Sequence, residues 1–173
     1  SKAMSGVTAE LPFINVAGEY LAGILSSEEL KHFEATIAKD PQAKMVVDEL
    51  KELMDPFLGA IASEALRVAR QAGYQEKESD QTWPSIAPGI TGRVLHYDHM
   101  VGSMIYIAKL EPGARCLEAD DGSPEECMLI SGDFSLCNAM LSVGELYSAS
   151  ESVIHSGGHT DAGAILLIRA RDS

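Results

Sequence analysis

The second half of the chain consists of short apolar runs that are separated by glycine and proline. Four of these runs have the length and β-branched content of strands, namely residues 93–97, 104–108, 127–130 and 164–168. Turn-forming residues fall between them, at Pro88-Gly89, Pro112-Gly113, Gly132, Gly144 and Gly157-Gly158. Many short strands at this spacing are typical of a β-sandwich or β-barrel. We therefore expect an all-β domain over residues 83–173.

The first half has the periodicity of helices. Ser26 and Glu29 have the spacing of a capping box, and apolar residues recur after them at helical intervals. Asp40-Pro41 and Asp55-Pro56 each have the form of an N-cap followed by proline at the first helical position. The pattern predicts a small bundle over residues 1–73 with three helices, or four if residues 12–23 form another. The polar run 74–82 is predicted to be a linker, so the fold class is α+β.

The charge of the chain is strongly acidic, with 13 basic and 26 acidic residues and a net charge of −13. We do not expect direct binding to nucleic acid, because that requires clustered Lys and Arg. No run of about 18 apolar residues is present, so we expect no membrane-spanning helix, and the start lacks the pattern of a secretory signal. Three cysteines without a Cys-x2-Cys pair fit a reducing compartment. The expected location is the cytoplasm.

Residues 112–134 join a Pro-Gly turn, an acidic loop and a Glu-led apolar strand that ends in Gly132-Asp133. His155 follows later, and Trp83-Pro84 and residues 19–23 (Glu-Tyr-Leu-Ala-Gly) precede this stretch. In order and spacing these residues resemble the ChrR family of bacterial anti-sigma factors, over nearly the whole chain and more closely in its second half. The resemblance implies a helical anti-sigma domain followed by a cupin domain, which is a double-stranded β-helix or jelly-roll barrel.

The resemblance also implies a zinc site in the helical domain. The positions that match its ligands are Leu11, Thr36, Asp40 and Ala43, and none of them is a thiolate or an imidazole. We therefore expect no zinc in this domain, with Asp40 and Pro41 forming an ordinary helix cap instead.

In the cupin domain, the resemblance places the metal ligands at Ala119, Asp121, Glu125 and His155. Asp121, Glu125 and His155 retain donor atoms, whereas Ala119 has none. One histidine with two carboxylates suits Mn or Fe better than Zn, and three ligands leave coordination positions open. The alternative, which we favour, is a site without metal in which Glu125 and His155 form a buried hydrogen-bonded pair.

Other candidates surround this predicted site. Cys127 lies two residues after Glu125, so regular strand alternation would direct both side chains to one face, and a buried structural role is expected for this cysteine. His159 is expected to be exposed, although it could line the mouth of the barrel. His96 and His99 flank a two-residue turn without a further ligand nearby, which is a weak metal signal.

Three functions remain open. The first is a regulatory protein that resembles an anti-sigma factor: its helices bind an ECF-type sigma factor, and its cupin domain senses a ligand or a stress. The second is a small metal-dependent enzyme of the dioxygenase kind, with Asp121, Glu125 and His155 as ligands. The third is a metal-free binding module whose barrel interior is lined by Leu129, Cys127 and Ile107. We favour the first, with no catalytic residue assigned, and expect a homodimer.

Overall fold

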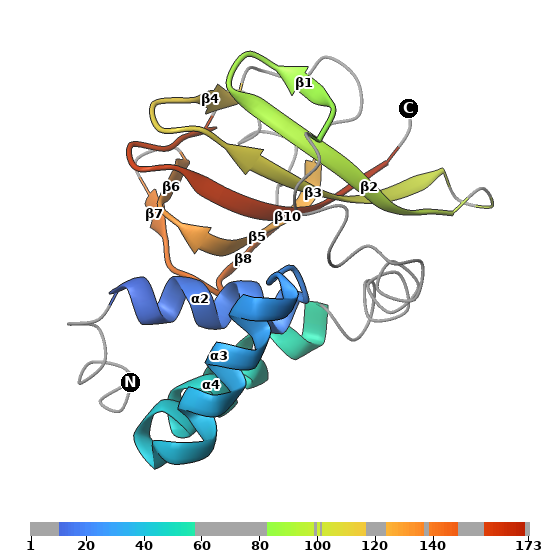
Figure 1. Ribbon diagram of the computed structural model, residues 1–173. Helices are drawn as coiled ribbons and strands as arrows, with labels where there is room; N and C mark the ends of the chain where they lie inside the picture. Colours follow the sequence, from blue (N-terminus) through green and yellow to red (C-terminus); the bar gives the residue numbers. More distant parts are fainter. Residues whose placement is uncertain are drawn as a thin grey trace. The chain divides into compact units, whose positions relative to one another are not determined.

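The computed structural model describes residues 11–57, 83–98, 100, 102–116, 124–136, 139–148 and 158–171. The chain divides into two compact units, Ser1–Thr82 and Trp83–Ser173. The first unit contains three described helices, α2 (Leu11–Ala22), α3 (Ser27–Lys39) and α4 (Pro41–Phe57) (Figure 1). The predicted linker 74–82 lies outside the described residues, as does the segment from 58 onward in which a last helix was expected.

Two of the predicted helix starts are confirmed by their hydrogen bonds. Ser26 caps α3: the backbone N–H of Glu29 donates to Ser26 Oγ over 3.2 Å, and the N–H of Ser26 donates to Glu29 Oε1 over 3.0 Å. Asp40 caps α4, because its Oδ1 accepts from the N–H groups of Gln42 at 3.0 Å and Ala43 at 3.3 Å. Asp40 therefore satisfies helix N–H groups, as the sequence predicts.

The third predicted helix start, at Asp55-Pro56, is wrong. Helix α4 continues through both residues to Phe57 and contains Pro56 in its last turn. The Asp55 carboxylate accepts a hydrogen bond from Lys51 Nζ, one turn earlier on the same helix, instead of capping a new one. An Asp-Pro pair near the end of a helix thus has the same local sequence as a helix start, and only the side-chain partner distinguishes the two.

Aromatic rings join α2 to α3. Phe33 of α3 is 4% exposed, and its ring centroid lies 5.4 Å from that of Phe13 and 4.8 Å from that of Tyr20, both on α2. Helix α4 contributes a buried stripe at helical spacing, made of Ala43, Val46, Val47, Leu50 and Met54. The described helices therefore share apolar faces, while the complete bundle of residues 1–73 stays a prediction.

The second unit consists of two antiparallel sheets. The six-stranded sheet has the order β1-β2-β3-β10-β5-β8 and the four-stranded sheet the order β4-β9-β6-β7. Their bounds are β1 Ser85–Ala87, β2 Ile90–Asp98, β3 Ser103–Leu110, β4 Arg115–Cys116, β5 Pro124–Gly132, β6 Phe134–Leu136, β7 Ala139–Leu141, β8 Leu146–Ser148, β9 Gly158–His159 and β10 Ala164–Arg171. The four runs that the sequence predicts as strands all lie within strands.

The strand order identifies the barrel class. When the strands are counted from β3 as the first to β10 as the eighth, the two sheets read 1-8-3-6 and 2-7-4-5. This is the order of two interlocked Greek keys, which is the jelly roll to which the cupins belong. The predicted barrel is thus confirmed at the level of fold, with β1 and β2 as additional strands at one edge.

The space between the two sheets holds the core of this unit. Strand β10 lies between β3 and β5, and its residues Leu166 and Ile168 belong to the core cluster together with Leu129 and Cys127 of β5. Phe134 of the four-stranded sheet fills the space over Gly158, since a Cβ on that glycine would lie 2.2 Å from Phe134 Cζ. The core is therefore built from both sheets, as a sandwich requires.

Ile107 does not line this interior, so that prediction is wrong. Its register partner on β10 is Leu167, whose partner on β5 is Met128, whereas the interior residues Leu166 and Leu129 pair with each other. Ile107, Leu167 and Met128 therefore lie on the outer face of the six-stranded sheet, and all three are buried there. Because both faces are apolar, the runs in β3 and β10 lack the alternation that would distinguish inside from outside.

Gly132 is the residue that allows β5 to turn into β6. Its φ is +90°, and a Cβ there would lie 2.0 Å from the carbonyl oxygen of Gly163. Gly113 has a similar φ of +84°, but a Cβ on it would meet no atom within 4 Å. The two glycines thus separate the conformational cost of a side chain from its steric cost.

We predict that Gly132→Ala destabilises the protein more than Gly113→Ala does. Both variants incur the cost of a left-handed conformation, about 1–2 kcal/mol, whereas only Gly132→Ala adds a backbone clash that costs about 1–3 kcal/mol or more. Urea denaturation midpoints of the two variants measure the difference. Equal midpoints would show that the Gly132–Gly163 approach is not required for folding.

Candidate functional site

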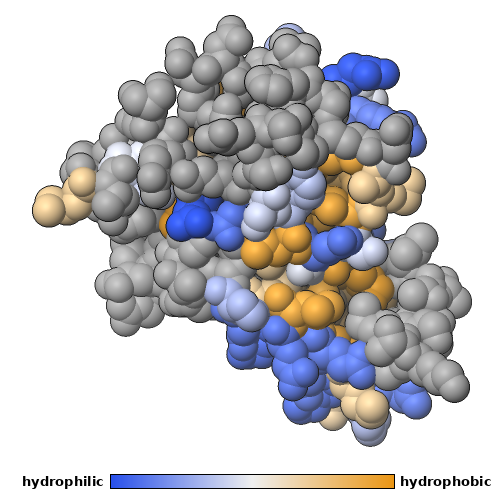
Figure 2. Space-filling model, turned by 180° about the vertical axis from the view of Figure 1, so that it is seen from behind, coloured by the Kyte–Doolittle hydropathy of each residue, from blue (hydrophilic) through white to orange (hydrophobic). Residues whose placement is uncertain are grey.

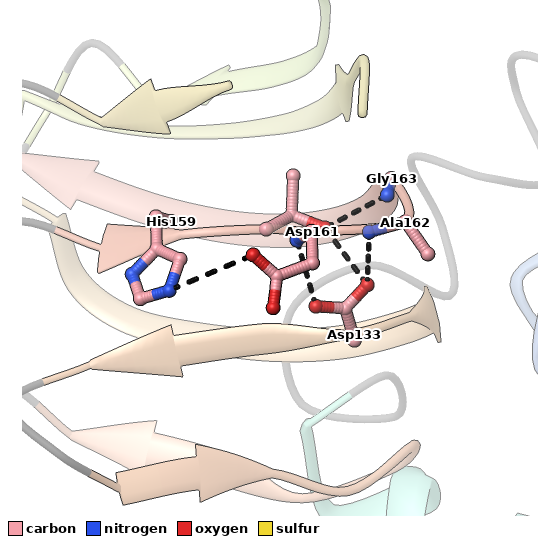
Figure 3. A network of polar contacts seen from close by, with 6 residues as sticks. Asp133, His159, Asp161, Ala162 and Gly163 are labelled. Atoms are coloured by element: carbon pink, nitrogen blue, oxygen red, sulfur yellow. Dashed lines mark hydrogen bonds and ion pairs between the residues drawn. The ribbon is translucent and has the colours of Figure 1, made fainter. Parts of the chain in front are cut away.

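One end of the barrel is held by the carboxylate of Asp133. Asp133 follows Gly132 at the corner between β5 and β6, and it accepts hydrogen bonds from the turn between β9 and β10 (Figure 3). Its donors are the N–H of Asp161 at 2.9 Å, the N–H of Ala162 at 2.7 Å and the hydroxyl of Thr160 at 3.1 Å. The backbone N–H of Asp133 donates in return to the carbonyl of Gly163 at 3.1 Å. These hydrogen bonds join the β5–β6 corner to the β9–β10 turn, which is far from it in sequence.

The environment of Asp133 favours its charged form. Burial raises the pKa of the carboxyl, but the hydrogen bonds from Asp161, Ala162 and Thr160, together with His159, lower it by more, so the pKa lies below its usual value. Thr160 is 1% exposed, and its hydroxyl also accepts a bond from the N–H of Gly163 at 2.9 Å. The Thr160 hydroxyl and the N–H groups of Asp161, Ala162 and Gly163 are all engaged within this network, so we interpret it as structural and name this end the closed end.

The strand registers bring together, at the opposite end of the barrel, the strand ends that precede and follow the segments of the predicted site. Cys116, the last residue of β4, pairs with Gly158, the first residue of β9. Ser148, the last residue of β8, pairs with Glu126 near the start of β5. The segments that carry Asp121 and His155 lie outside the described residues, but they connect these four strand ends. We name this the ligand end, after the metal ligands that the sequence resemblance implies, and define it by Cys116, Pro124–Glu126, Ser148 and Gly158.

Glu125 lies in β5 at a break in the register, and its side chain lies outside the described residues. Glu126 pairs with Arg169 of β10, and the next pair is Pro124 with Ala170, so Glu125 is the extra residue of a β-bulge. The bulge interrupts regular alternation. The expectation that Glu125 and Cys127 share a face rests on that alternation, and it stays a prediction because the Glu125 side chain lies outside the described residues.

A row of side chains crosses the inner face of the large sheet next to the ligand end. Tyr106 pairs with Ile168, Ile168 with Cys127, and Cys127 with Tyr147. Cys127 and Ile168 are each 6% exposed, while the two tyrosines are only partly buried. The expected buried role of Cys127 is confirmed. Towards the closed end, the next row is fully buried, with Leu166 at 1% and Leu129 at 0% exposed.

The histidines do not form a second site in the part of the chain that the structure describes. The side chain of His159 is 42% exposed, and its Nε2 lies 4.0 Å from Asp161 Oδ1, which agrees with the predicted exposed position. His96 lies in β2 with a side chain outside the described residues, and His99 is outside them entirely. Among the described residues no group of three or more His, Cys, Asp and Glu side chains could hold a metal ion. No described helix has both the length and the apolarity to cross a membrane.

Sequence reasoning missed the Asp133 network and the ion pair between Glu126 and Arg169. A partial signal exists for the first, because an aspartate after a glycine at a strand end often accepts backbone N–H groups. The partner turn lies 27 residues away from Asp133 at Thr160, however, and nothing local identifies it. The ion pair depends on a strand register that the sequence does not fix.

No protein-family model and no curated protein matches this chain. Among solved structures, the complex of Rhodobacter sphaeroides SigE with the anti-sigma ChrR is 16% identical, with 90% of this chain and 94% of that chain covered and a TM-score of 0.47. KdgF from Halomonas sp. is 18% identical, with 54% and 89% covered and a TM-score of 0.39. A putative acetylacetone dioxygenase from Methylibium petroleiphilum PM1 is 15% identical, with 55% and 74% covered and a TM-score of 0.44. Similarities at this level carry over no activity, ligand or partner.

We predict that Asp133→Asn destabilises the protein by about 1–3 kcal/mol at neutral pH, because an amide replaces one acceptor oxygen with a donor that faces N–H groups. The pKa of Asp133 is lowered in the folded state, so its contribution is complete above the unfolded value of about 3.9 and disappears as the pH falls through the folded pKa. Denaturation curves from pH 7 down to below the folded pKa of Asp133 should therefore show the two proteins converging at the acidic end.

Asp161→Asn is the matched control for this experiment. Asp161 is exposed, and it contributes its backbone N–H, which the substitution retains, to the Asp133 carboxylate. We expect a change within about 0.5 kcal/mol for this variant. A loss of stability in Asp161→Asn equal to that in Asp133→Asn would contradict the role assigned to Asp133.

Proposed function

We propose that the chain is a regulatory protein of the anti-sigma-factor type. Residues 1–82 bind an ECF-type sigma factor, and the jelly roll in residues 83–173 senses a small ligand or a stress at its ligand end. The sequence resemblance supports this proposal over nearly the whole chain. The structural observation that carries it is the order of the two units, a helical unit that ends at Thr82 followed by a jelly-roll unit that begins at Trp83.

Helix α4 offers the clearest candidate surface for the partner. Met45 and Leu53 are the exposed large hydrophobic residues of the described helices, with 53% and 56% exposure. They lie eight residues apart, which is about 12 Å along a helix. In Figure 2 the face of the helical unit that is turned to the viewer, at the bottom, is mostly hydrophilic. A small apolar pair on a charged helix suits a partner that contributes both apolar and basic groups, because the chain as a whole is strongly acidic.

Binding of purified ECF-type sigma factors from the source genome tests this proposal by titration calorimetry. We expect one of them to bind, and we expect the double variant Met45→Glu/Leu53→Glu to weaken that binding by roughly ten-fold or more, as loss of central apolar contacts does. Met140→Glu is the control, since Met140 is a 69% exposed methionine on the jelly roll. Absence of binding by every such factor would contradict the proposal, and an equal effect of the control would move the surface away from α4.

A metal-dependent enzyme is the second candidate, and one observation favours it. The strand ends that lead to Asp121, Glu125 and His155 meet at one end of the barrel through the Cys116–Gly158 and Ser148–Glu126 pairs. A set of donors made of two carboxylates and one imidazole suits Mn or Fe, because carboxylate oxygens favour harder metal ions. If bound, such an ion would supply open coordination positions for a small substrate, while these three residues would hold it.

Metal content separates the two candidates. For the regulatory function we expect little Mn, Fe or Zn in untagged protein by inductively coupled plasma mass spectrometry. Near-stoichiometric metal that disappears in Glu125→Ala/His155→Ala, with an unchanged circular dichroism spectrum, would instead support the enzyme. Native mass spectrometry of the same sample would show whether the barrel retains an organic ligand.

A further inference from the structure

Strand β1 is the first element of the jelly roll and lies at one edge of the six-stranded sheet. The second unit begins at Trp83, two residues before β1, and β2 is the single neighbour of β1 in the order of the described strands. Two register pairs join β1 to β2, namely Ser85 with Thr91 and Ala87 with Ile90, and the register shifts between them. Strand β2 pairs with β3 on its other side. Loss of β1 would therefore leave the pairing of β2 with β3 in place.

The side chain of Ile86 occupies the place that a side chain on Gly92 would fill. A Cβ on Gly92 would lie 3.0 Å from Ile86 Cδ1 and 3.7 Å from Ile86 Cγ2. Gly92 pairs with Ala108, a core residue, so Ile86 lies over the inner face of the sheet. Two residues further along β2, Val94 pairs with Tyr106, which belongs to the row of side chains next to the ligand end. Ile86 is 54% exposed, so its contact with Gly92 removes only part of the side chain from water.

The two ends of β1 are held by different parts of the jelly roll. In the turn that follows β1, the carbonyl of Gly89 accepts a hydrogen bond from the N–H of Glu111 at 2.8 Å. At the start of β1, the N–H of Gly92 donates to the carbonyl of Pro84 at 2.9 Å. The turn is thus fixed by the segment after β3, whereas the start depends on β2 through this hydrogen bond and the contact of Ile86 with Gly92.

We infer that residues 84–87 form a latch where the chain enters the jelly roll: docked through Ile86 on Gly92, the latch opens while the rest of the barrel stays folded. Its release lengthens the connection to the helical unit by up to roughly 13 Å, at about 3.3 Å for each extended residue. The proposed regulatory function requires a path from the barrel to the helical unit, and the use of the latch as that path rests on the proposed function.

Amide hydrogen exchange of the full chain, followed residue by residue by NMR, tests the latch without any partner. The amide of Gly92 is the reporter, because it bonds to Pro84 and is freed when the latch opens. Ile86→Ser removes the apolar contact and retains the backbone. We expect the Gly92 amide of this variant to exchange roughly three- to ten-fold faster, as the partial burial of an isoleucine implies. Exchange in β10 should be unchanged, because the barrel stays folded.

Two further variants separate the latch from a general loss of stability. Gly92→Val places a side chain where Ile86 lies, so the amide of residue 92 should again exchange faster after correction for the new side chain. Val94→Ser removes an apolar side chain of nearly the same exposure, 55%, and should leave this amide unchanged.

Unchanged exchange at residue 92 in both Ile86→Ser and Gly92→Val would overturn the inference. An equal acceleration in Val94→Ser, or throughout β10, would overturn it as well, because β1 would then open only together with the barrel. Absence of binding to any ECF-type sigma factor would remove the proposed function, whereas these exchange rates would still decide whether the latch exists.

Discussion

The hydrogen bonds of the Asp133 carboxylate are the constraint on which the jelly roll depends. The carboxylate joins the β5–β6 corner to the β9–β10 turn. Each of these connections leads from one sheet to the other, because β5 and β10 lie in the six-stranded sheet and β6 and β9 in the four-stranded sheet. A jelly roll closes only when its two sheets are held face to face, and here three donors from one turn converge on a single side chain. The close approach of Gly132 to Gly163 belongs to the same contact, because any side chain at Gly132 would separate the two connections.

The other end of the barrel is the one that we propose to carry the function. From the closed end to the ligand end, the inner face changes from fully buried Leu129 and Leu166 to the partly buried Tyr106 and Tyr147. The same end receives the strand termini that lead to Asp121 and His155, and it contains the bulge at Glu125.

The sequence predicted the features that depend on local chemistry. The helix starts at Ser26 and Asp40 follow from side chains that bond to N–H groups two or three residues away, and the jelly-roll strands follow from apolar runs and turn residues. Prediction failed where the observed partner of a residue differs from the one that the local pattern suggests. Asp55 bonds to Lys51 and does not cap a helix, and Ile107 lies on the outer face of a sheet that is apolar on both sides. The bulge at Glu125 and the partners of Asp133 are set by strand register, which periodicity alone does not specify.

We propose that the helical unit binds the regulatory partner while the barrel senses the signal. Hydrogen–deuterium exchange of the full chain, with and without a purified ECF-type sigma factor that it binds, tests this proposal. We predict slower exchange on binding in α4, around Met45 and Leu53, and little change in the central strand β10. Protection confined to residues 83–173, with unchanged exchange in α4, would place the partner on the barrel and contradict the account.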